Sequence, residues 1–258
     1  MVRTLSLLAL VLATAAAADA SSPEKLDVAV RGQTLTLALY RPSGTPRGTL
    51  VIGSGDVGWV GLAVTVAEEF SSLGYAVVGI NVRQYLAAFT AGSSHVQPSD
   101  VPGDYRALVA AARGRQPLPR PVVLAGVSEG AALAVAAAAD AANRAWVDGV
   151  ITMGLPATAE LAWRWTDVGS WITRRDMNEP SFSAFDYVPR VAPVPLYMIQ
   201  SRKDEYVPPA DYERFAAIAR EPARQVLIAA ANHRFTDRRD ELQRAIVDGL
   251  AWIRERQR

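Results

Sequence analysis

Hydrophobic and polar positions alternate with a period of two near the start of the chain. Residues 26–30 and 34–40 show this alternation, which predicts the two strands of an antiparallel hairpin. Gly32 lies in the short connection between them and can take the positive φ that a tight turn requires. The chain therefore begins its folded part with a hairpin.

Short apolar runs alternate with helical patterns along the rest of the chain. Buried strands are predicted over residues 49–53, 75–82, 121–126, 147–153, 196–200 and 226–230. Helices are predicted over residues 59–73, 104–113 and 130–142, and near the C-terminus, where one helical face carries Leu242, Ala245, Ile246, Leu250 and Ile253. This alternation is typical of right-handed βαβ units, so we expect an α/β fold with a mostly parallel sheet and helices on both faces.

One stretch, residues 157–193, has the least regular pattern. It contains Trp163, Trp165 and Trp171, half of the six tryptophans in the chain. No linker or internal repeat divides the remainder. We therefore expect a single domain over residues 21–258, in which 157–193 is an inserted, lid-like segment.

The first twenty residues have the three parts of a secretory signal peptide. A positive start at residues 1–3 precedes an apolar run over 5–18, and Ala18-Asp19-Ala20 supplies a small-residue cleavage site. The apolar run is too short and too rich in alanine to span a bilayer comfortably, and an uncleaved anchor is the alternative. We expect a periplasmic or secreted protein.

Composition narrows the classes of partner and cofactor. The 258 residues include 27 Lys or Arg and 26 Asp or Glu, so the formal net charge is +1. The sequence also has no cluster of basic residues of the kind that binds nucleic acid. The chain has no cysteine, which excludes disulfides, thiolate nucleophiles and Cys-ligated metal. We expect no nucleic-acid partner and neither a metal nor an organic cofactor, and the sequence leaves the oligomeric state open.

A serine between two glycines lies where a predicted strand meets a predicted helix. Residues 126–130 read Gly-Val-Ser-Glu-Gly, which matches the G-x-S-x-G pattern of a nucleophile elbow. A strand that turns sharply into a helix exposes the serine hydroxyl, and glycine two residues away on either side avoids collisions. Ser128 is therefore the candidate nucleophile, and an ordinary tight turn is the alternative.

A serine hydroxyl needs a base, and histidine is the usual one. His233 follows the last predicted strand, where a base can lie over the carboxyl edge of the sheet. His95 precedes the serine in a loop that contains Ser, Gly and Pro, and we expect it to be solvated. His233 is thus the candidate base.

The third member of a catalytic triad is an acid that orients the imidazole. Asp204 follows the predicted strand 196–200 directly, and it gives the order nucleophile, acid, base along the chain. Glu205 is the main rival and Asp186 a more distant one. A solvated loop carboxylate is the alternative for Asp204.

Two amides are needed to stabilise an oxyanion. The first candidate is the backbone N–H of Glu129, at the start of the helix after the serine. The second comes from the glycine-rich loop 53–59, where Asp56 and Val57 are both candidates. A simple strand-to-helix turn is the alternative for this loop, and the absence of a following lysine argues against a phosphate-binding loop.

These motifs resemble those of the α/β-hydrolases over nearly all of residues 26–258. Within that superfamily the chain is similar to the bacterial virulence protein VirJ/AcvB family, in residues 55–59, in residues 82–85 and in the serine elbow. Members usually have an aromatic residue before the serine and Phe after it, where this chain has Val127 and Glu129. The family's paired histidines correspond here to His233 and Arg234.

The resemblance implies an exported enzyme that hydrolyses aminoacyl esters of phosphatidylglycerol. Glu129 and Asp56 would then face a cationic aminoacyl group and Arg83 a lipid phosphate. Trp59 is a further candidate for substrate binding. Ordinary structural roles are the alternative for each: Glu129 as an acid in the first helical turn, Asp56 as a turn residue and Arg83 as a surface charge.

The tryptophans of residues 157–193 either line an acyl or lipid pocket or pack the insert on the core. We expect an exported serine hydrolase that cleaves a small-molecule or lipid ester through an acyl-enzyme, and peripheral membrane contact stays open. An amidase or aminopeptidase is the first alternative. The second is a binding protein in which the same fold is not catalytic.

Overall fold

The computed structural model describes residues 22–90, 96–163 and 180–257. Its centre is an eight-stranded sheet with the order β1-β2-β4-β3-β5-β6-β9-β10. The strands are β1 (Glu24–Val30), β2 (Gln33–Tyr40), β3 (Thr49–Gly53), β4 (Ala76–Ile80), β5 (Val122–Val127), β6 (Gly149–Met153), β9 (Leu196–Ser201) and β10 (Ala223–Ile228). Strand β2 runs antiparallel to β1 and β4, and the other neighbours are parallel.

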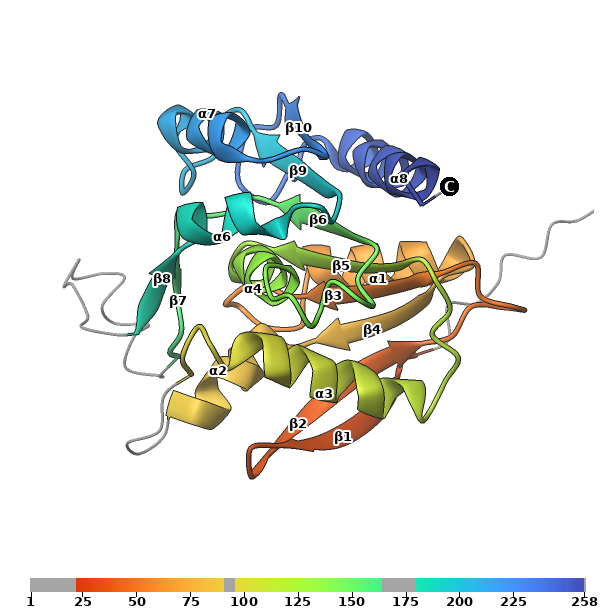
Figure 1. Ribbon diagram of the computed structural model, residues 1–258. Coiled ribbons are helices and arrows are strands. Elements are labelled where there is room, and N and C mark those ends of the chain that lie inside the picture. Colours follow the sequence, from red (N-terminus) through yellow and green to blue (C-terminus); the bar gives the residue numbers. More distant parts are fainter. Residues whose placement is uncertain (1–21, 91–95, 164–179, 258) are drawn as a thin grey trace, which may run out of the picture.

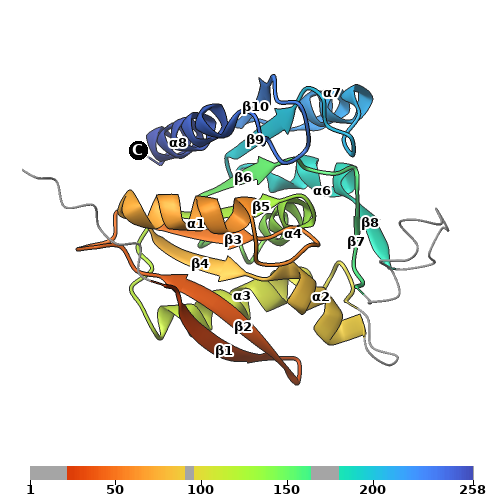
Figure 2. The ribbon, with the colours of Figure 1, turned by 180° about the vertical axis from the view of Figure 1, so that it is seen from behind.

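Helices cover both faces of this sheet, as Figures 1 and 2 show from opposite sides. One face carries α1 (Leu62–Ser72) and α8 (Arg239–Glu255). The other face carries α2 (Val82–Thr90), α3 (Val101–Arg113), α4 (Glu129–Ala138), α6 (Ala184–Val191) and α7 (Pro209–Ile218). The predicted α/β fold with a mostly parallel sheet is therefore confirmed.

The central strands are buried on both sides, which explains their continuous apolar runs. In β3, Leu50 and Ile52 face the layer of α1 and α8, whereas Val51 faces the layer that contains α4. Helix α4 is almost entirely buried and consists mainly of alanine. These small side chains let the helix lie close to the sheet, so that a Cβ on Gly53 would be 3.1 Å from Cα of Gly130.

The structure also contains elements that the sequence pattern did not predict. These are α2, α6, α7 and a separate antiparallel pair formed by β7 (Thr158–Glu160) and β8 (Ser181–Ser183). The strand predicted over 75–82 ends at Ile80, and residue 82 begins α2 instead. The first helix begins at Leu62 rather than at 59, because residues 54–61 form the loop after β3.

Several predictions lie outside the described residues. They concern the signal peptide over 1–20, His95, and residues 164–179 of the predicted lid-like segment. The described parts of that segment form β7, β8 and α6, which packs against α4 and α7. Within the described ranges, no helix has both the length and the apolar character needed to cross a membrane.

Candidate active site

The candidate nucleophile lies on a sharp corner between β5 and α4. Ser128 has φ 53° and ψ −121°, a conformation that side-chain-bearing residues rarely adopt. A Cβ on Gly126 would lie 2.1 Å from the carbonyl carbon and oxygen of Gly130, and a Cβ on Gly130 would lie 2.4 Å from the carbonyl oxygens of Gly53 and Ser54. Both glycines are therefore required by the close approach of backbone, as expected for a nucleophile elbow.

The end of β6 supports both the serine and the histidine. The backbone N–H of Ser128 donates to the carbonyl of Met153 at 3.0 Å. The next residue, Gly154, has φ +63°, and a Cβ there would lie 2.6 Å from Cε1 and 2.9 Å from Nδ1 of His233. Gly154 thus provides the space for the imidazole, a role that the sequence pattern did not indicate, although the glycine directly follows the strand predicted over 147–153.

The candidate base and acid form a buried hydrogen-bonded pair. Nδ1 of His233 lies 2.7 Å from Oδ2 of Asp204, and the two side chains are 8% and 0% exposed. The other oxygen, Oδ1, accepts hydrogen bonds from the backbone N–H groups of Tyr206 and Val207 at 2.9 and 3.0 Å. These donors hold the carboxylate toward the imidazole, and Nδ1–H donation to it leaves Nε2 as the basic nitrogen.

The two rival acids lie elsewhere. Glu205 does not contact the imidazole nitrogen but accepts a hydrogen bond from the backbone N–H of His233, with 2.8 Å between that nitrogen and Oε2. Asp186 is exposed in the first turn of α6. The geometry therefore gives the acid position to Asp204, and it gives Glu205 a role in holding the histidine loop.

The surroundings of His233 favour its protonated form. Burial lowers the pKa of the imidazole, but the hydrogen bond to Asp204 and the charges of Asp204, Glu129 and Glu205 outweigh burial and raise it above its ordinary value. A base with a raised pKa accepts a proton more readily from a hydroxyl. The same shift makes the imidazole positively charged over a wider range of acidic pH.

The loop after β3 brings a backbone amide to the serine. The N–H of Ser54 donates to the carbonyl of Ile80 at 3.0 Å, and the Ser54 hydroxyl accepts from the N–H of Val82 at 3.1 Å. The loop is thereby anchored to the end of β4 and the start of α2. Of the two residues that the sequence left open, Asp56 is the one whose N–H is directed toward Glu129, with 3.4 Å between the nitrogen and Oε2.

The carboxylate of Glu129 is thus part of the site. Burial and repulsion by Asp56 raise its pKa, against hydrogen bonds from the Ser128 hydroxyl and from the backbone N–H groups of Glu129 and Asp56. His233, by contrast, has an Nε2 atom that is buried and has no hydrogen-bond partner within the described ranges. The serine hydroxyl is therefore not hydrogen-bonded to the histidine in this structure.

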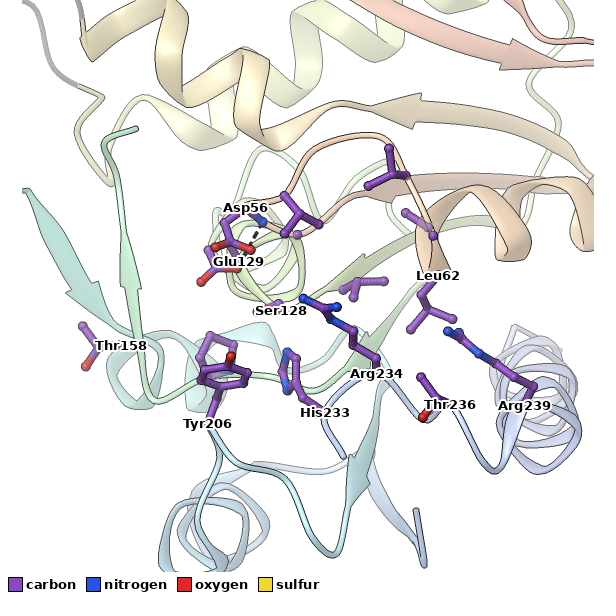
Figure 3. Close-up of a pocket in the computed structure, with 17 residues that line it drawn as sticks. Asp56, Leu62, Ser128, Glu129, Thr158, Tyr206, His233, Arg234, Thr236 and Arg239 are labelled. Carbon is purple, nitrogen blue, oxygen red and sulfur yellow. Dashed lines mark hydrogen bonds between the residues drawn. The ribbon is translucent and has the colours of Figure 1, made fainter. Parts of the chain in front are cut away.

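A cavity of about 610 Å³ surrounds these groups, and Figure 3 shows its lining. Its apolar wall includes Val57, Val60, Leu62, Ala63 and Val127. The ring of Tyr206 meets that of His233 edge to face, with 5.2 Å between the centroids. Such a cavity is large enough for a small acyl group together with part of its leaving group.

The cavity carries opposite charges on its two sides. Glu129 and Asp56 lie on one side of Ser128, whereas Arg234 and Arg239 lie toward α1 and α8 (Figure 3). Nη1 of Arg239 is buried and has no hydrogen-bond partner within the part of the chain that the structure describes. Burial lowers the pKa of this guanidinium, and the charge of Glu69 offsets part of the shift.

The two residues predicted to bind substrate do not line this cavity. The Trp59 ring packs on β4, where a Cβ on Gly79 would lie 2.2 Å from its ring. The guanidinium of Arg83 lies 4.0 Å from the centre of the Trp163 ring. The structure therefore does not bring Trp59 or Arg83 together with Ser128, and both pack against neighbouring elements.

The described residues offer no evident place for a metal ion. No group of three or more His, Cys, Asp or Glu side chains is arranged to hold one within those ranges.

A family model now gives an independent comparison. The model of the bacterial virulence protein VirJ family matches residues 48–252, which include the serine elbow, Asp204 and His233. No curated protein sequence matches the chain at a significant level.

The chain is similar in fold to several solved structures that are described as esterases or α/β hydrolases. The chain is similar to the esterase domain of a Rhodothermus marinus protein, with a TM-score of 0.61, 20% identity and coverage of 90% of this chain and 98% of that one. It is also similar to Est1E from Butyrivibrio proteoclasticus, with a TM-score of 0.62, 16% identity and coverage of 88% and 99%. The α/β hydrolase GrgF from Penicillium sp. sh18 has a TM-score of 0.66, 14% identity and coverage of 88% and 97%. At these identities the likeness shows the fold.

Proposed function

The chain belongs to the bacterial virulence protein VirJ family and has the α/β-hydrolase fold, and on this basis we propose that it is a serine hydrolase that cleaves a carboxylic ester. One observation carries the proposal. His233, which is hydrogen-bonded to the buried Asp204 with 2.7 Å between Nδ1 and Oδ2, lines the same cavity as the strained Ser128. A serine, an imidazole and an orienting carboxylate in this order are the parts that acyl transfer requires.

In the first half of the reaction, Oγ of Ser128 attacks the ester carbonyl carbon while Nε2 of His233 takes the hydroxyl proton. The carbonyl oxygen becomes an oxyanion, and the N–H groups of Glu129 and Asp56 donate to it. The bond between the carbonyl carbon and the alcohol oxygen then breaks. The departing alcohol takes the proton from His233, and the acyl group stays on Ser128.

In the second half, Nε2 of His233 removes a proton from water, and the resulting hydroxide oxygen bonds to the acyl carbon. A second oxyanion forms at the same two amides. When it collapses, the bond to Ser128 breaks and His233 returns the proton to Oγ. Asp204 orients the imidazole throughout and stabilises the imidazolium each time that it forms.

We propose further that the acyl group is cationic and that the alcohol part carries an acidic group, as in an aminoacyl ester of an anionic lipid. The charge distribution of the cavity supports this class, because Glu129 and Asp56 lie on one side of Ser128 and Arg234 and Arg239 on the other. Nη1 of Arg239 has no hydrogen-bond partner among the described residues, and we propose that an acidic group of the substrate supplies one.

The test compares matched substrates. An alanyl ester of phosphatidylglycerol in mixed micelles should be hydrolysed faster than its N-acetylated counterpart, and an alanyl anilide should be cleaved slowly or not at all. Ser128→Ala provides the inactive control. Cleavage of the anilide at the rate of the ester would favour an amidase, and no cleavage of any substrate would favour a binding protein.

We also propose that the protein acts in the periplasm or outside the cell and contacts a membrane only peripherally. The signal-peptide pattern of residues 1–20 supports export. Intact-mass measurement on a periplasmic extract should find a chain that begins at Ser21. A full-length chain retained in the cytoplasm would contradict the proposal.

A further inference from the structure

The side chain of Glu129 lies where the oxyanion of the reaction should form. Its Oε2 atom accepts a hydrogen bond from the N–H of Asp56, with 3.4 Å between nitrogen and oxygen, and Figure 3 marks this contact. The backbone N–H groups of Glu129 and Asp56 both lower the pKa of this carboxylate against the effect of burial. These are the two amides that the proposed reaction uses to stabilise the tetrahedral intermediate. A negative oxygen of the protein thus takes the place of the negative oxygen of the substrate.

The nucleophile is not yet paired with its base. The buried Nε2 of His233 has no hydrogen-bond partner within the described part of the chain, so the Ser128 hydroxyl does not donate to it. The same hydroxyl is one of the groups that lower the pKa of Glu129 against the effect of burial. The serine is therefore in a resting arrangement while the histidine and Asp204 are already paired.

We infer that Glu129 determines specificity by occupying the oxyanion hole of the resting enzyme, so that its carboxylate has to leave before a substrate carbonyl can enter. The inference rests on the proposed function, because it concerns the same site. When the carboxylate leaves, the Asp56 and Glu129 amides become free for the substrate oxygen, and the Ser128 hydroxyl can turn to His233. Two oxyanions cannot share the hole, because like charges at contact distance repel strongly.

Displacement of Glu129 does not cost the same for every substrate. An ammonium group next to the scissile carbonyl offers the displaced carboxylate a charge-assisted hydrogen bond. A neutral acyl group offers none, so the carboxylate has to move without a new partner. Glu129 therefore selects against neutral esters as much as it favours cationic ones, which is how binding sites often achieve discrimination.

The rate of covalent labelling by an uncharged alkyl fluorophosphonate tests the inference. The tetrahedral phosphonate places an oxygen in the oxyanion hole and carries no cation. We expect Glu129→Ala to be labelled at Ser128 at least about tenfold faster than the unchanged protein, because both amides are then free to donate to the phosphonate oxygen. The size of the effect follows from other enzymes, in which loss of one oxyanion donor changes the rate by about 10²- to 10³-fold. Glu213→Ala on the exposed surface of α7 is the matched control and should label at the unchanged rate.

Two further measurements keep the outcomes distinct. Glu129→Gln removes the charge but keeps the shape, and its labelling rate should lie between those of the unchanged protein and Glu129→Ala. In ester hydrolysis, the preference for the alanyl over the N-acetylalanyl ester should fall at least about tenfold in Glu129→Ala, with a faster reaction of the neutral ester. Thermal unfolding shows which variants fold, and Glu129→Gln carries the test if Glu129→Ala does not.

Labelling of the unchanged protein without acceleration in the Glu129 variants would overturn the inference and leave the proposed function intact. Slower labelling of both variants would also overturn it and would make Glu129 a residue that assists the reaction. If no variant were labelled under conditions that label another serine hydrolase, the proposed function itself would be wrong, and the inference with it.

Discussion

The two halves of the candidate triad differ in how completely they are assembled. In the acid–base half, Asp204 and His233 are joined by a 2.7 Å hydrogen bond. In the nucleophile half, Nε2 of His233 has no hydrogen-bond partner among the described residues, and the Asp56 amide donates to Glu129. One half is therefore ready for proton transfer, while the other still has to rearrange.

The difference follows from what holds each half in place. Asp204 is held by two backbone N–H groups, and Glu205 holds the backbone of His233. Gly154 leaves room for the imidazole beside the end of β6. The conformation of Ser128 is equally fixed by its glycine neighbours, but its hydroxyl can rotate between two acceptors. Backbone contacts thus fix the acid–base pair, whereas we expect the position of one side chain, Glu129, to decide the state of the nucleophile.

The largest effect is expected from Ser128→Ala, which removes the nucleophile without filling space. Ester turnover should fall by about 10⁴- to 10⁶-fold, as for other serine nucleophiles. The free energy of unfolding should change by no more than about 0.5 kcal/mol, because the substitution leaves packing intact. Steady-state kinetics and chemical denaturation check both values.

Ser99→Ala, in an exposed turn, is the control for that comparison and should keep full activity. Retained turnover in Ser128→Ala would contradict the assignment of the nucleophile.

Asp204→Asn separates the acid–base pair while keeping an oxygen for the two backbone donors. We expect a loss in kcat of about 10⁴-fold, because the amide favours the wrong imidazole tautomer. The acid limb of kcat/KM should also move to lower pH, since Asp204 helps to raise the pKa of His233. A pH–rate profile over roughly pH 4 to 9, a range that spans the titration of a histidine, measures both effects.

Glu205→Gln is the matched variant, since glutamine can still accept the N–H of His233. Its kcat should stay within about tenfold of the unchanged protein, because it is not the acid of the triad. If Glu205→Gln lost more activity than Asp204→Asn, the order of the two carboxylates would be wrong.

Gly154→Ala should displace the imidazole, because the new Cβ would lie 2.6 Å from Cε1 of His233. We expect kcat/KM to fall by about 10²-fold, the usual effect of a displacement of about 1 Å. The backbone strain at positive φ should also lower stability by about 1 kcal/mol. Activity and thermal unfolding are measured together.

Gly44→Ala isolates the backbone strain in that experiment. Gly44 has φ +87° and no atoms within 4 Å of a built Cβ, so the substitution should lower stability without changing activity. Equal losses of activity in the two variants would show that space for the imidazole is not what Gly154 provides.

Glu129→Gln should have the smallest effect on the free energy of unfolding, and the size of this effect depends on pH. The folded protein raises the pKa of Glu129 above the ordinary 4.5, so ionisation of this group weakens the folded state. Below the unfolded pKa the two proteins should be similarly stable. As the pH rises through the folded pKa of Glu129, the unchanged protein should become less stable than the variant. Urea unfolding at roughly pH 4 and pH 8, on either side of this titration, measures the difference.

Asp240→Asn, at the exposed start of α8, provides the surface control for that series. If Glu129→Gln were less stable than the unchanged protein at the higher pH, the Glu129 carboxylate would stabilise the turn that carries Ser128, and the prediction would be wrong.

Much of this site is predictable from the sequence, because its parts follow strand ends. A side chain at either glycine beside Ser128 would collide with the backbone, so glycine is required there, and the G-x-S-x-G motif predicts this directly. The positions of Asp204 and His233 follow from the topology, since parallel strands end at the same edge of the sheet. The choice of Asp204 over Glu205 depends on loop geometry, and the sequence left it open.

The missed elements are those in which local signals conflict. The β-branched Val82 extends the apolar run of β4, so α2 was overlooked. The signal for α2 was the Asn81 side chain, whose Oδ1 accepts from the N–H of Gln84 at the start of the helix. Apolar side chains spaced for one helical face follow it: Val82, Tyr85, Leu86 and Phe89.

Contacts between distant segments were beyond the sequence pattern altogether. The Glu129 carboxylate meets the amide of Asp56, a residue 73 positions earlier in the chain. Trp59 and Arg83 carry family-like motifs, yet they pack on Gly79 and Trp163 rather than in the cavity. A motif shows which residue types occur together, and only the packing shows which surface they serve.

The most direct test of the account is the intact mass of the mature protein after exposure to a fluorophosphonate probe, with Ser128→Ala and His233→Ala measured alongside. We predict one phosphonate adduct per chain in the unchanged protein and none in either variant over the same time, because an unactivated serine hydroxyl is a poor nucleophile. The absence of an adduct in the unchanged protein, under conditions that fully label another serine hydrolase, would contradict the claim that Ser128 is an activated nucleophile.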